Sequence, residues 1–421
     1  MKILKIITLI IYSIFVSIIF LAFLELILYF FTPKYFDRLS YITSIIKQDS
    51  ILFWKQKENL NREFEKQNLI TNSLGFRCHE ISNKDKVRYI ALGGSPTFGW
   101  GVKYEDTYPV VVENNLKQKN IDIEAINAGE IGYSSFQGLN FLKNIILDLK
   151  PDILTVSYVI NDIDKYRFFR SSFLPDSKLE PMSENIIKIS NILQNSNIIK
   201  TLKYFSTKLT TNKEKYYGKN FNNQYNTNRR VSLQEYEQNL NKFADIAQEN
   251  NIDLVFIVMP VNFPGKKELN EEETEKIKTL TDKVGELIEK KDFIEAKVII
   301  EDVLKIDEYL PVAYYYLGVI AHQENDINTA NELFEKAKNY EIFDLAALAL
   351  KYNDVMRKVA KERDILLCDS AKDFKEYKKD YLFVDSQKDC FHPNDIGHKI
   401  IADKLTSIFI DKELYKYKNQ E

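Results

Sequence analysis

The chain has 421 residues, which is enough for two or three domains. Hydrophobic residues make up 45% of it and charged residues 28%, a globular balance that excludes a mostly disordered protein. Its 58 Lys and Arg residues against 61 Asp and Glu give a net charge of −3, so we expect no nucleic-acid partner, and three cysteines are too few for a disulfide scaffold.

An almost unbroken apolar run, IITLIIYSIFVSIIFLAFLELILYFF, occupies Ile6–Phe31. At about 1.5 Å per residue a helix of this length exceeds the ~30 Å hydrocarbon thickness of a bilayer. The alternative is a cleaved signal peptide, but the run is long for one and no small-x-small cleavage site closes it. We therefore predict a transmembrane anchor over residues 1–34. Lys2 and Lys5 favour a cytoplasmic N-terminus, which places the rest of the chain outside the cytoplasm.

A polar linker and entry segment is expected over residues 35–85, and from residue 86 apolar runs alternate with helical stretches. Helices are expected at 108–116, 137–149 and 232–250, the last capped by Ser232 with Glu235 three residues on. Continuous apolar runs between helices predict a parallel five-stranded sheet covered on both faces, an α/β fold. The expected strands are 87–92, 123–127, 153–160, 254–260 and 365–368.

Two stretches break this alternation. Residues 164–230 predict either a lid or a surface excursion, and an acidic helical insertion over 266–345 divides the α/β domain into 86–265 and 346–421. Within the insertion, several residues have the spacing of a tetratricopeptide repeat, which predicts about two such repeats, with a generic helical hairpin as the alternative. These residues are Tyr314, Leu317, Gly318, Ala321, Ala330, Phe334 and Ala337.

A glycine-rich turn, GGSPTFGWG, follows the first expected strand and contains Ser95. The glycines allow a tight turn that presents the serine hydroxyl above the sheet, with a helix expected only later in the chain. A phosphate-binding loop is the alternative, but neither G-x-x-x-x-G-K-S/T nor a fitting G-x-G-x-x-G is present. The sequence therefore indicates a serine nucleophile.

Only four histidines are available as a base for that serine, and His392 follows Asp389 by three residues. A carboxylate at this spacing can reach Nδ1 and leave Nε2 free as the base, although Asp-x-x-His alone is a weak signal. Two further turns after expected strands carry Gly132 and Asn161, whose N–H groups are candidate oxyanion donors.

Taken together, Ser95, Gly132, Asn161 and His392 resemble, in this order, the four signature residues of the SGNH (GDSL-type) hydrolase superfamily. The resemblance covers about residues 70–265 and 345–410, and the sequence is similar to a membrane-anchored bacterial branch of the superfamily, several members of which carry helical repeats. It extends to flanking segments: NSLGFR (72–77), GGSPTFGWGV (93–102), TYP (107–109), INAGEIGYSS (126–135), KPD (150–152) and ND (161–162).

The resemblance implies a flavodoxin-like three-layer sandwich and a role for each signature residue. Ser95 would be the nucleophile and an oxyanion donor, Gly132 and Asn161 the other donors, His392 the base and Asp389 its orienting carboxylate. The sequence departs from the family pattern at Gly94, where aspartate is usual, and lacks the common glycine before Asn161.

The function expected from this resemblance is a membrane-anchored, extracytoplasmic serine esterase that cleaves acyl esters, acetyl esters above all, on cell-envelope polysaccharide or glycolipid. No metal or cofactor is expected. The alternatives are an O-acyltransferase that uses the same site, a catalytically degenerate scaffold whose repeats bind a protein partner, and a carbohydrate-binding protein that retains the cleft without the chemistry.

We interpret several other residues that could have a chemical role as structural. His322 is expected to be structural, His398 to begin the C-terminal helix and pack or solvate, and Cys390 to point away from the histidine. Phe98 and Trp100 are expected either in the core or lining a substrate pocket. Asp385 and Asp389 are not expected to act as the carboxylate pair of a glycosidase.

Overall fold

The computed structural model describes residues 2–31, 38–83, 85–164, 167–169, 174–202, 229–262, 269–377, 381–385 and 389–416. These residues form two compact units. The first comprises those within 1–55 and 180–226, and the second those within 56–179 and 227–421. Much of the predicted excursion at 164–230, and the predicted boundary at 265/266, lie outside the described residues.

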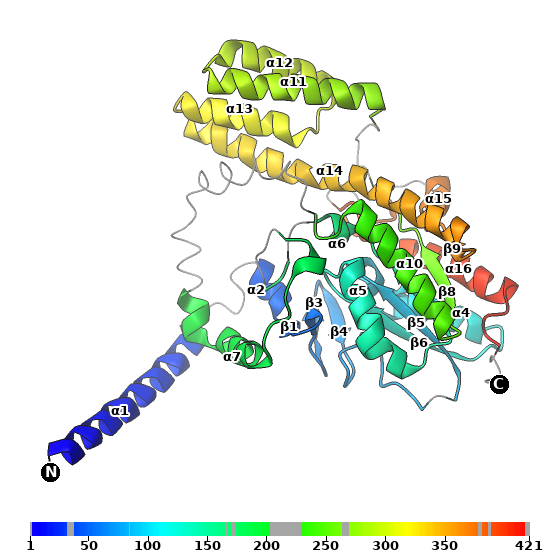
Figure 1. The fold of residues 1–421 in the computed structure, drawn as a ribbon, viewed down its shortest axis with the longest axis horizontal. Coiled ribbons are helices and arrows are strands. Elements are labelled where there is room, and N and C mark those ends of the chain that lie inside the picture. The colour runs from blue at the N-terminus through cyan, green and yellow to red at the C-terminus, as the bar shows by residue number, and fades with distance from the viewer. Residues whose placement is uncertain are drawn as a thin grey trace. The chain divides into compact units, whose positions relative to one another are not determined.

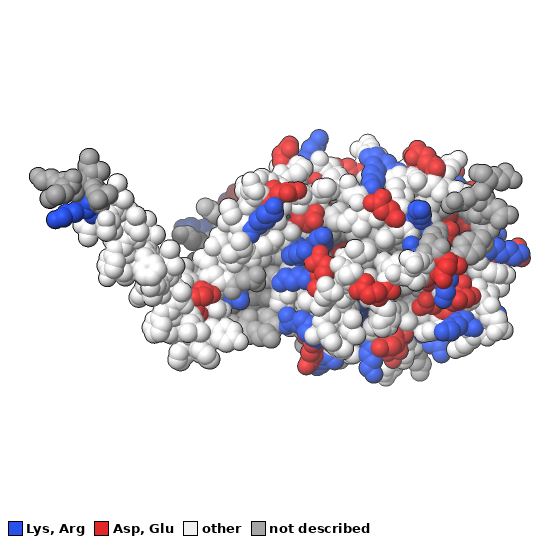
Figure 2. Space-filling model, turned by 90° about the horizontal axis from the view of Figure 1, so that it is seen from below, with Lys and Arg blue, Asp and Glu red and all other residues white. Residues whose placement is uncertain are grey.

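The first unit contains one long apolar helix and a few short elements. Lys5–Phe31, within α1 (Lys2–Phe31), is long and apolar enough to cross a membrane, and its side chains are almost all exposed. The surface of this helix is accordingly nearly all white in Figure 2. The unit also contains α2 (Arg38–Thr43), the two-stranded sheet of β1 (Ile46–Asp49) and β2 (Phe53–Gln56), and α7 (Glu184–Asn195); Gln56, the last residue of β2, already belongs to the second unit.

The second unit is built on a parallel five-stranded sheet in the order β6-β5-β7-β8-β9, which confirms the predicted α/β fold and the flavodoxin-like topology. Gly93 pairs with both Gly129 and Ser157, so neighbouring strands end at the same level. Turns that carry polar residues therefore meet at one edge of the sheet. The strands are β5 (Val87–Gly93), β6 (Ile123–Gly129), β7 (Ile153–Ser157), β8 (Asp253–Ile257) and β9 (Leu366–Cys368).

Two of the expected strands are too long at their carboxyl ends. The third ends at Ser157 rather than at residue 160, and Ile160–Ile163 form the helical turn α6. The backbone leaves the extended conformation at Val159, which has ψ −60°. The fourth ends at Ile257 rather than at residue 260. Apolar side chains continue past both strand ends because the turns that follow are themselves partly buried, and hydrophobicity does not distinguish these turns from strand.

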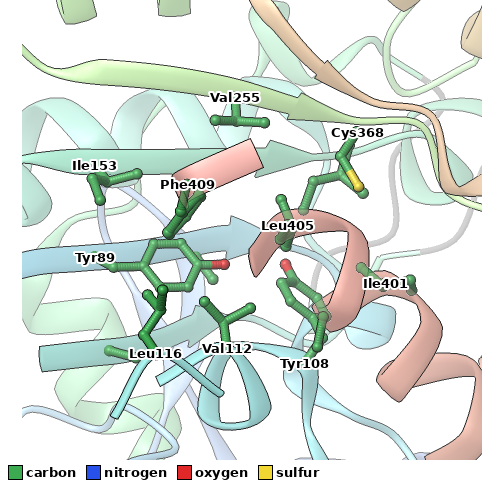
Figure 3. Close-up of a cluster of buried hydrophobic side chains, with 14 of the residues drawn as sticks. Tyr89, Tyr108, Val112, Leu116, Ile153, Val255, Cys368, Ile401, Leu405 and Phe409 are labelled. Carbon is green, nitrogen blue, oxygen red and sulfur yellow. The ribbon is translucent and has the colours of Figure 1, made fainter. Parts of the chain in front are cut away.

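Helices cover both faces of the sheet (Figure 1), and successive side chains of a strand point to opposite faces. Tyr89, Ile153 and Val255 face α4 (Tyr108–Lys117) and α16 (Asp395–Asp411) in a buried cluster, which Figure 3 shows with Val112, Leu405 and Phe409. The other face is covered by α5 (Ser135–Phe141) and α10 (Leu233–Glu249). α5 continues as a π-turn and a 3-10 turn to Leu149, and the predicted capping box of Ser232 and Glu235 is present.

Helices α11 to α14 form the insertion and pack in consecutive pairs. A Cβ on Gly318 would lie 2.6 Å from the Phe334 ring, so a small residue is required where α13 and α14 meet. α14 continues without a break through the predicted boundary at 345/346. The assignment of these helices to tetratricopeptide repeats stays a prediction. Their bounds are α11 (Glu271–Glu289), α12 (Phe293–Ile306), α13 (Pro311–Gln323) and α14 (Ile327–Glu362).

Short elements complete the second unit. They are the antiparallel hairpin of β3 (Asn61–Phe64) and β4 (Gln67–Ile70), the helical turns α3 (Ser95–Phe98) and α15 (Ser370–Asp373), and the 3-10 turns Tyr104–Asp106, Asp176–Lys178 and Phe374–Glu376.

Candidate active site

Ser95 is the first residue of α3, directly after β5. The expectation that a helix follows only later is wrong, because the helical turn begins at the serine itself. Pro96 suits this first turn since its fixed φ is helical and its missing N–H needs no partner there. A Cβ on Gly129 would lie 2.2 Å from Phe98 N, so this glycine lets α3 pack against the end of β6. The turn is therefore held rigidly above the sheet.

His392 lies beside Ser95 although 297 residues separate them in the sequence. Its Nε2 is 2.8 Å from Ser95 Oγ, and its Nδ1 is 2.8 Å from Asp389 Oδ2. The loop that carries His392 is fixed by a hydrogen bond from Val384 N to His392 O, 2.9 Å long. The structure thus joins the predicted serine, histidine and aspartate in one hydrogen-bonded chain.

Asp389 uses both carboxylate oxygens. Oδ2 faces His392, while Oδ1 accepts hydrogen bonds from the backbone N–H groups of Phe391 (2.9 Å) and His392 (3.0 Å). Burial alone raises the pKa of Asp389, but the His392 charge and these hydrogen bonds outweigh it and hold the pKa below its ordinary value. An ionised Asp389 accepts a hydrogen bond from the Nδ1–H group, so Nε2 is left as the acceptor that faces Ser95.

The Asn161 side chain lies against the turn that precedes Ser95. Its Nδ2 donates to Tyr133 O over 3.1 Å, and because an amide has two N–H donors, one is left without a partner among the described residues. A Cβ on Gly94 would lie 2.9 Å from this Nδ2, closer than a real Cβ atom approaches. Glycine at position 94 therefore leaves room for the Asn161 amide.

Gly132 has φ +80°, a conformation that favours glycine. Its loop is bound to the end of β5, because Glu130 N donates to Gly93 O over 3.0 Å. The Gly132 carbonyl accepts a hydrogen bond from Arg230 over 2.8 Å. The backbone N–H of Gly132 stays a predicted oxyanion donor.

A buried ion pair behind this loop was not predicted from the sequence. Arg230 binds Asp176 over 3.0 Å as well as Gly132 O, and Asp176 also binds Arg167 over 2.6 Å and Ser134 Oγ over 2.6 Å. Burial raises the pKa of Asp176, but the two guanidinium groups outweigh it and lower the pKa. Arg167, Asp176 and Arg230 belong to the stretch interpreted as a lid or excursion, where isolated charges give no signal of burial.

Asp162 ties the Gly132 loop to α6. Its Oδ1 accepts hydrogen bonds from Ser135 N (2.9 Å) and Ser135 Oγ (2.5 Å), and Asn239 donates to the same hydroxyl. Complete burial raises the pKa of Asp162 to about 7, in spite of these hydrogen bonds. Because Asp162 follows Asn161 in the chain, this connection fixes the two expected oxyanion segments with respect to each other.

An open pocket lies next to Gly94 and Asn161, and α14 supplies part of its wall through Ala349 and Asn353. Asn353 Nδ2 donates to Met259 O over 3.0 Å, which fixes α14 to the residues that follow β8. Most of the remaining lining is apolar: Pro96, Tyr133, Tyr158, Val159, Ile160, Met259, Pro260, Val261 and Phe391.

Several of the structural interpretations can be compared with the structure. Phe98 is buried, and Trp100 is nearly so, with its ring centroid 5.8 Å from that of His392. His398 is fully buried within α16 and accepts a hydrogen bond from Tyr108 N over 3.1 Å, so it packs rather than solvates. Cys390 is buried and forms no disulfide.

Comparisons with known proteins identify remote structural similarity only. No protein-family model matches the chain, and no curated protein matches it. Three similar solved structures have TM-scores of 0.38: LAE5, an α/β hydrolase enzyme from the metagenome of Lake Arreo, Axe2, an acetylxylan esterase from Geobacillus stearothermophilus, and a lipase/acylhydrolase from Enterococcus faecalis. Their identities to this chain are 14%, 12% and 11%. The matches cover 79%, 79% and 77% of it and 97%, 95% and 96% of those chains. At this level the similarity carries no argument about activity, which depends on the site itself.

Proposed function

We propose that the protein is a serine hydrolase of the SGNH (GDSL-type) superfamily that cleaves acyl esters. The observation that carries this proposal is the chain of two 2.8 Å hydrogen bonds from Ser95 Oγ to His392 Nε2 and from His392 Nδ1 to Asp389. A serine needs such an adjacent base to act as a nucleophile near neutral pH.

In the proposed reaction, Ser95 Oγ attacks the ester carbonyl while its proton passes to His392 Nε2. The imidazolium, stabilised by Asp389, then gives this proton to the leaving alcohol, and an acyl-serine forms. Water attacks the acyl-serine with His392 again as the base, which releases the carboxylic acid and restores the hydroxyl. The developing oxyanion would be stabilised by the N–H groups of Ser95 and Gly132 and by the Asn161 amide.

The proposed location is the outer face of a cell membrane, with α1 as a single-pass anchor. The support is the length of Lys5–Phe31, its apolar composition and its exposure. An anchored esterase of this kind would have cell-envelope polysaccharide or glycolipid within reach, and acetyl esters of these are the proposed substrates. The helical insertion, if it consists of tetratricopeptide repeats, would offer a surface for a protein partner.

Substitution of the nucleophile tests the proposed reaction. Full-length protein with Ser95→Ala should lose turnover of p-nitrophenyl acetate by roughly 10⁴- to 10⁶-fold, because the acyl-serine can no longer form. Ser407→Ala, an exposed serine on α16, should retain full turnover. Equal turnover by Ser95→Ala and the unsubstituted protein, with both folded, would contradict the proposal.

A further inference from the structure

α7 presents an unusual apolar surface for a helix outside a membrane span. Ile186, Ile189, Ile192 and Leu193 are 57%, 58%, 71% and 46% exposed. At 100° per residue these four positions lie within an arc of about 120° on one side of the helix. The four side chains therefore form one continuous apolar face, which we call the isoleucine face.

The opposite side of α7 is already occupied. Ile187 is buried against the first unit, and Asn191 Oδ1 accepts a hydrogen bond from Gln48 N in β1. The isoleucine face thus cannot turn inward without loss of these contacts. Glu184 and Lys188 lie on the polar side of the helix, outside the apolar arc.

The C-terminal end of α7 is bound to α1. Within the first unit, Glu25 accepts hydrogen bonds from Ser196 Oγ (2.9 Å), from the backbone N–H of Ile198 (3.1 Å) and from that of Asn197. Glu25 is also the one acidic residue in the apolar run Ile6–Phe31. Glu25, the residue that is costly to place in a membrane, therefore accepts hydrogen bonds from the segment that follows α7.

The position of Glu25 along α1 sets the depth of this contact. Glu25 precedes Phe31, the end of the apolar run, by six residues, which is about 9 Å along a helix. Amphipathic helices that lie on a bilayer bury their apolar side about 5–10 Å into the boundary between headgroups and acyl chains. If α1 spans the membrane, the end of α7 is held at this depth.

We infer that α7 is an interfacial helix that inserts its isoleucine face into the lipid bilayer beside the anchor. The occupant of this face is lipid, because the segment that directly follows α7 is hydrogen-bonded to Glu25 within the apolar span of α1. Leu202, 61% exposed, adds apolar surface just beyond the bonded segment. This inference rests on the proposed membrane anchor and is independent of the proposed chemistry at Ser95.

Depth-dependent quenching tests the inference on full-length protein reconstituted into phosphatidylcholine vesicles. Single cysteines at Ile189, Ile192, Glu184 and Phe20 are labelled with an environment-sensitive fluorophore. Cys78, Cys368 and Cys390 are buried, and the unsubstituted protein reports any labelling of them. Some vesicles carry lipid with a nitroxide at carbon 5 of the acyl chain, and others carry it at carbon 12.

Labels at Ile189→Cys and Ile192→Cys should lose fluorescence most strongly with the shallow nitroxide, while the label at Glu184→Cys on the polar side loses much less. The label at Phe20→Cys in the middle of α1 should be quenched most by the deep nitroxide. If the label at Phe20→Cys is quenched but the labels at the isoleucine positions are quenched no more than the label at Glu184→Cys, the anchor is supported and the inference is overturned. A protein partner or a second copy of the chain on this face would give that result. If no position is quenched, both the anchor and the inference fail.

Discussion

The carboxylate of Asp389 is hydrogen-bonded to the imidazole of His392. Asp389→Asn keeps the shape of the side chain but removes the charge that holds the Nδ1 proton and stabilises the imidazolium. We expect turnover of p-nitrophenyl acetate to fall by up to about 10⁴-fold with little change in KM. Asp385→Asn, the other carboxylate of this loop, is the matched control and should remain active. A larger loss in Asp385→Asn than in Asp389→Asn would show that the wrong carboxylate has been assigned.

Gly94 offers a second prediction for a single residue. In Gly94→Ala the new methyl group would lie 2.9 Å from Asn161 Nδ2, so the amide must move away from the serine turn. We expect kcat to fall about 10²- to 10³-fold, the loss typical of one missing oxyanion donor, and Asn161→Ala to behave alike. Gly285→Ala, in a helix of the insertion, provides the control. Full activity in Gly94→Ala would exclude Asn161 as a donor positioned by this contact.

The three hydrogen-bonded residues of the candidate site could be predicted from the sequence because each lies in a short segment with its own signal. Ser95 follows a strand within a glycine-rich turn, and Asp389 and His392 have the spacing of an oriented base. Arg230 and Asp176 could not be predicted, because 54 positions separate them and neither lies in a motif. Their pairing is decided by tertiary structure, because a charge that the fold buries needs a partner of opposite charge beside it.

Among the elements, α14 belongs to two different parts of the fold. Its first part belongs to the helical insertion, and its second part supplies Ala349 and Asn353 to the pocket beside the serine turn. The sequence predicts a boundary at 345/346 because the repeat pattern ends there. A helix passes such a boundary without any local signal, since alanines and leucines favour helix on both sides of it.

Ala349 is the residue of α14 with which to test the pocket. Ala349→Leu adds apolar volume to the pocket wall, so turnover of p-nitrophenyl butyrate should fall more than that of p-nitrophenyl acetate. The extra carbon atoms cost about 1–3 kcal/mol of stability, which thermal unfolding would measure. Ala347→Leu, exposed on the same helix, is the control. An unchanged butyrate-to-acetate ratio would place the acyl chain elsewhere.

Stability of the whole molecule should depend on pH through His398. Burial lowers the pKa of this histidine to about 3 in the folded protein, while the unfolded chain protonates it near pH 6.5. Between these two pKa values the unfolded state binds more protons than the folded state does. Protonation of His398 therefore leaves the free energy of unfolding unchanged above about pH 6.5 and lowers it by up to about 1.4 kcal/mol for each pH unit of acidification below that.

His398→Gln keeps an acceptor near Tyr108 N but does not titrate. The unfolding midpoint of this variant should therefore fall less between pH 6.5 and pH 4 than that of the unsubstituted protein. Thermal unfolding at a series of pH values in detergent measures both slopes. Equal slopes would mean that His398 does not remain neutral in the folded state.

The predicted fold of the whole molecule is confirmed where alternation of strands and helices sets it, as in the five-stranded parallel sheet. The bonds from Glu25 to the segment after α7 are a different case. They join residues more than 170 positions apart, and the sequence shows only a carboxylate in an apolar run. The partners of an isolated charge depend on which segments the fold brings beside it.

The central claim is that His392 activates Ser95 as a nucleophile, and reaction with a fluorophosphonate tests it most directly. Folded full-length protein is treated with the reagent, digested and mapped by mass spectrometry, with His392→Gln in parallel. We expect a covalent adduct on Ser95, and a much slower reaction in His392→Gln because the base is absent. A folded protein that forms no adduct, or forms it on a serine other than Ser95, would contradict the claim.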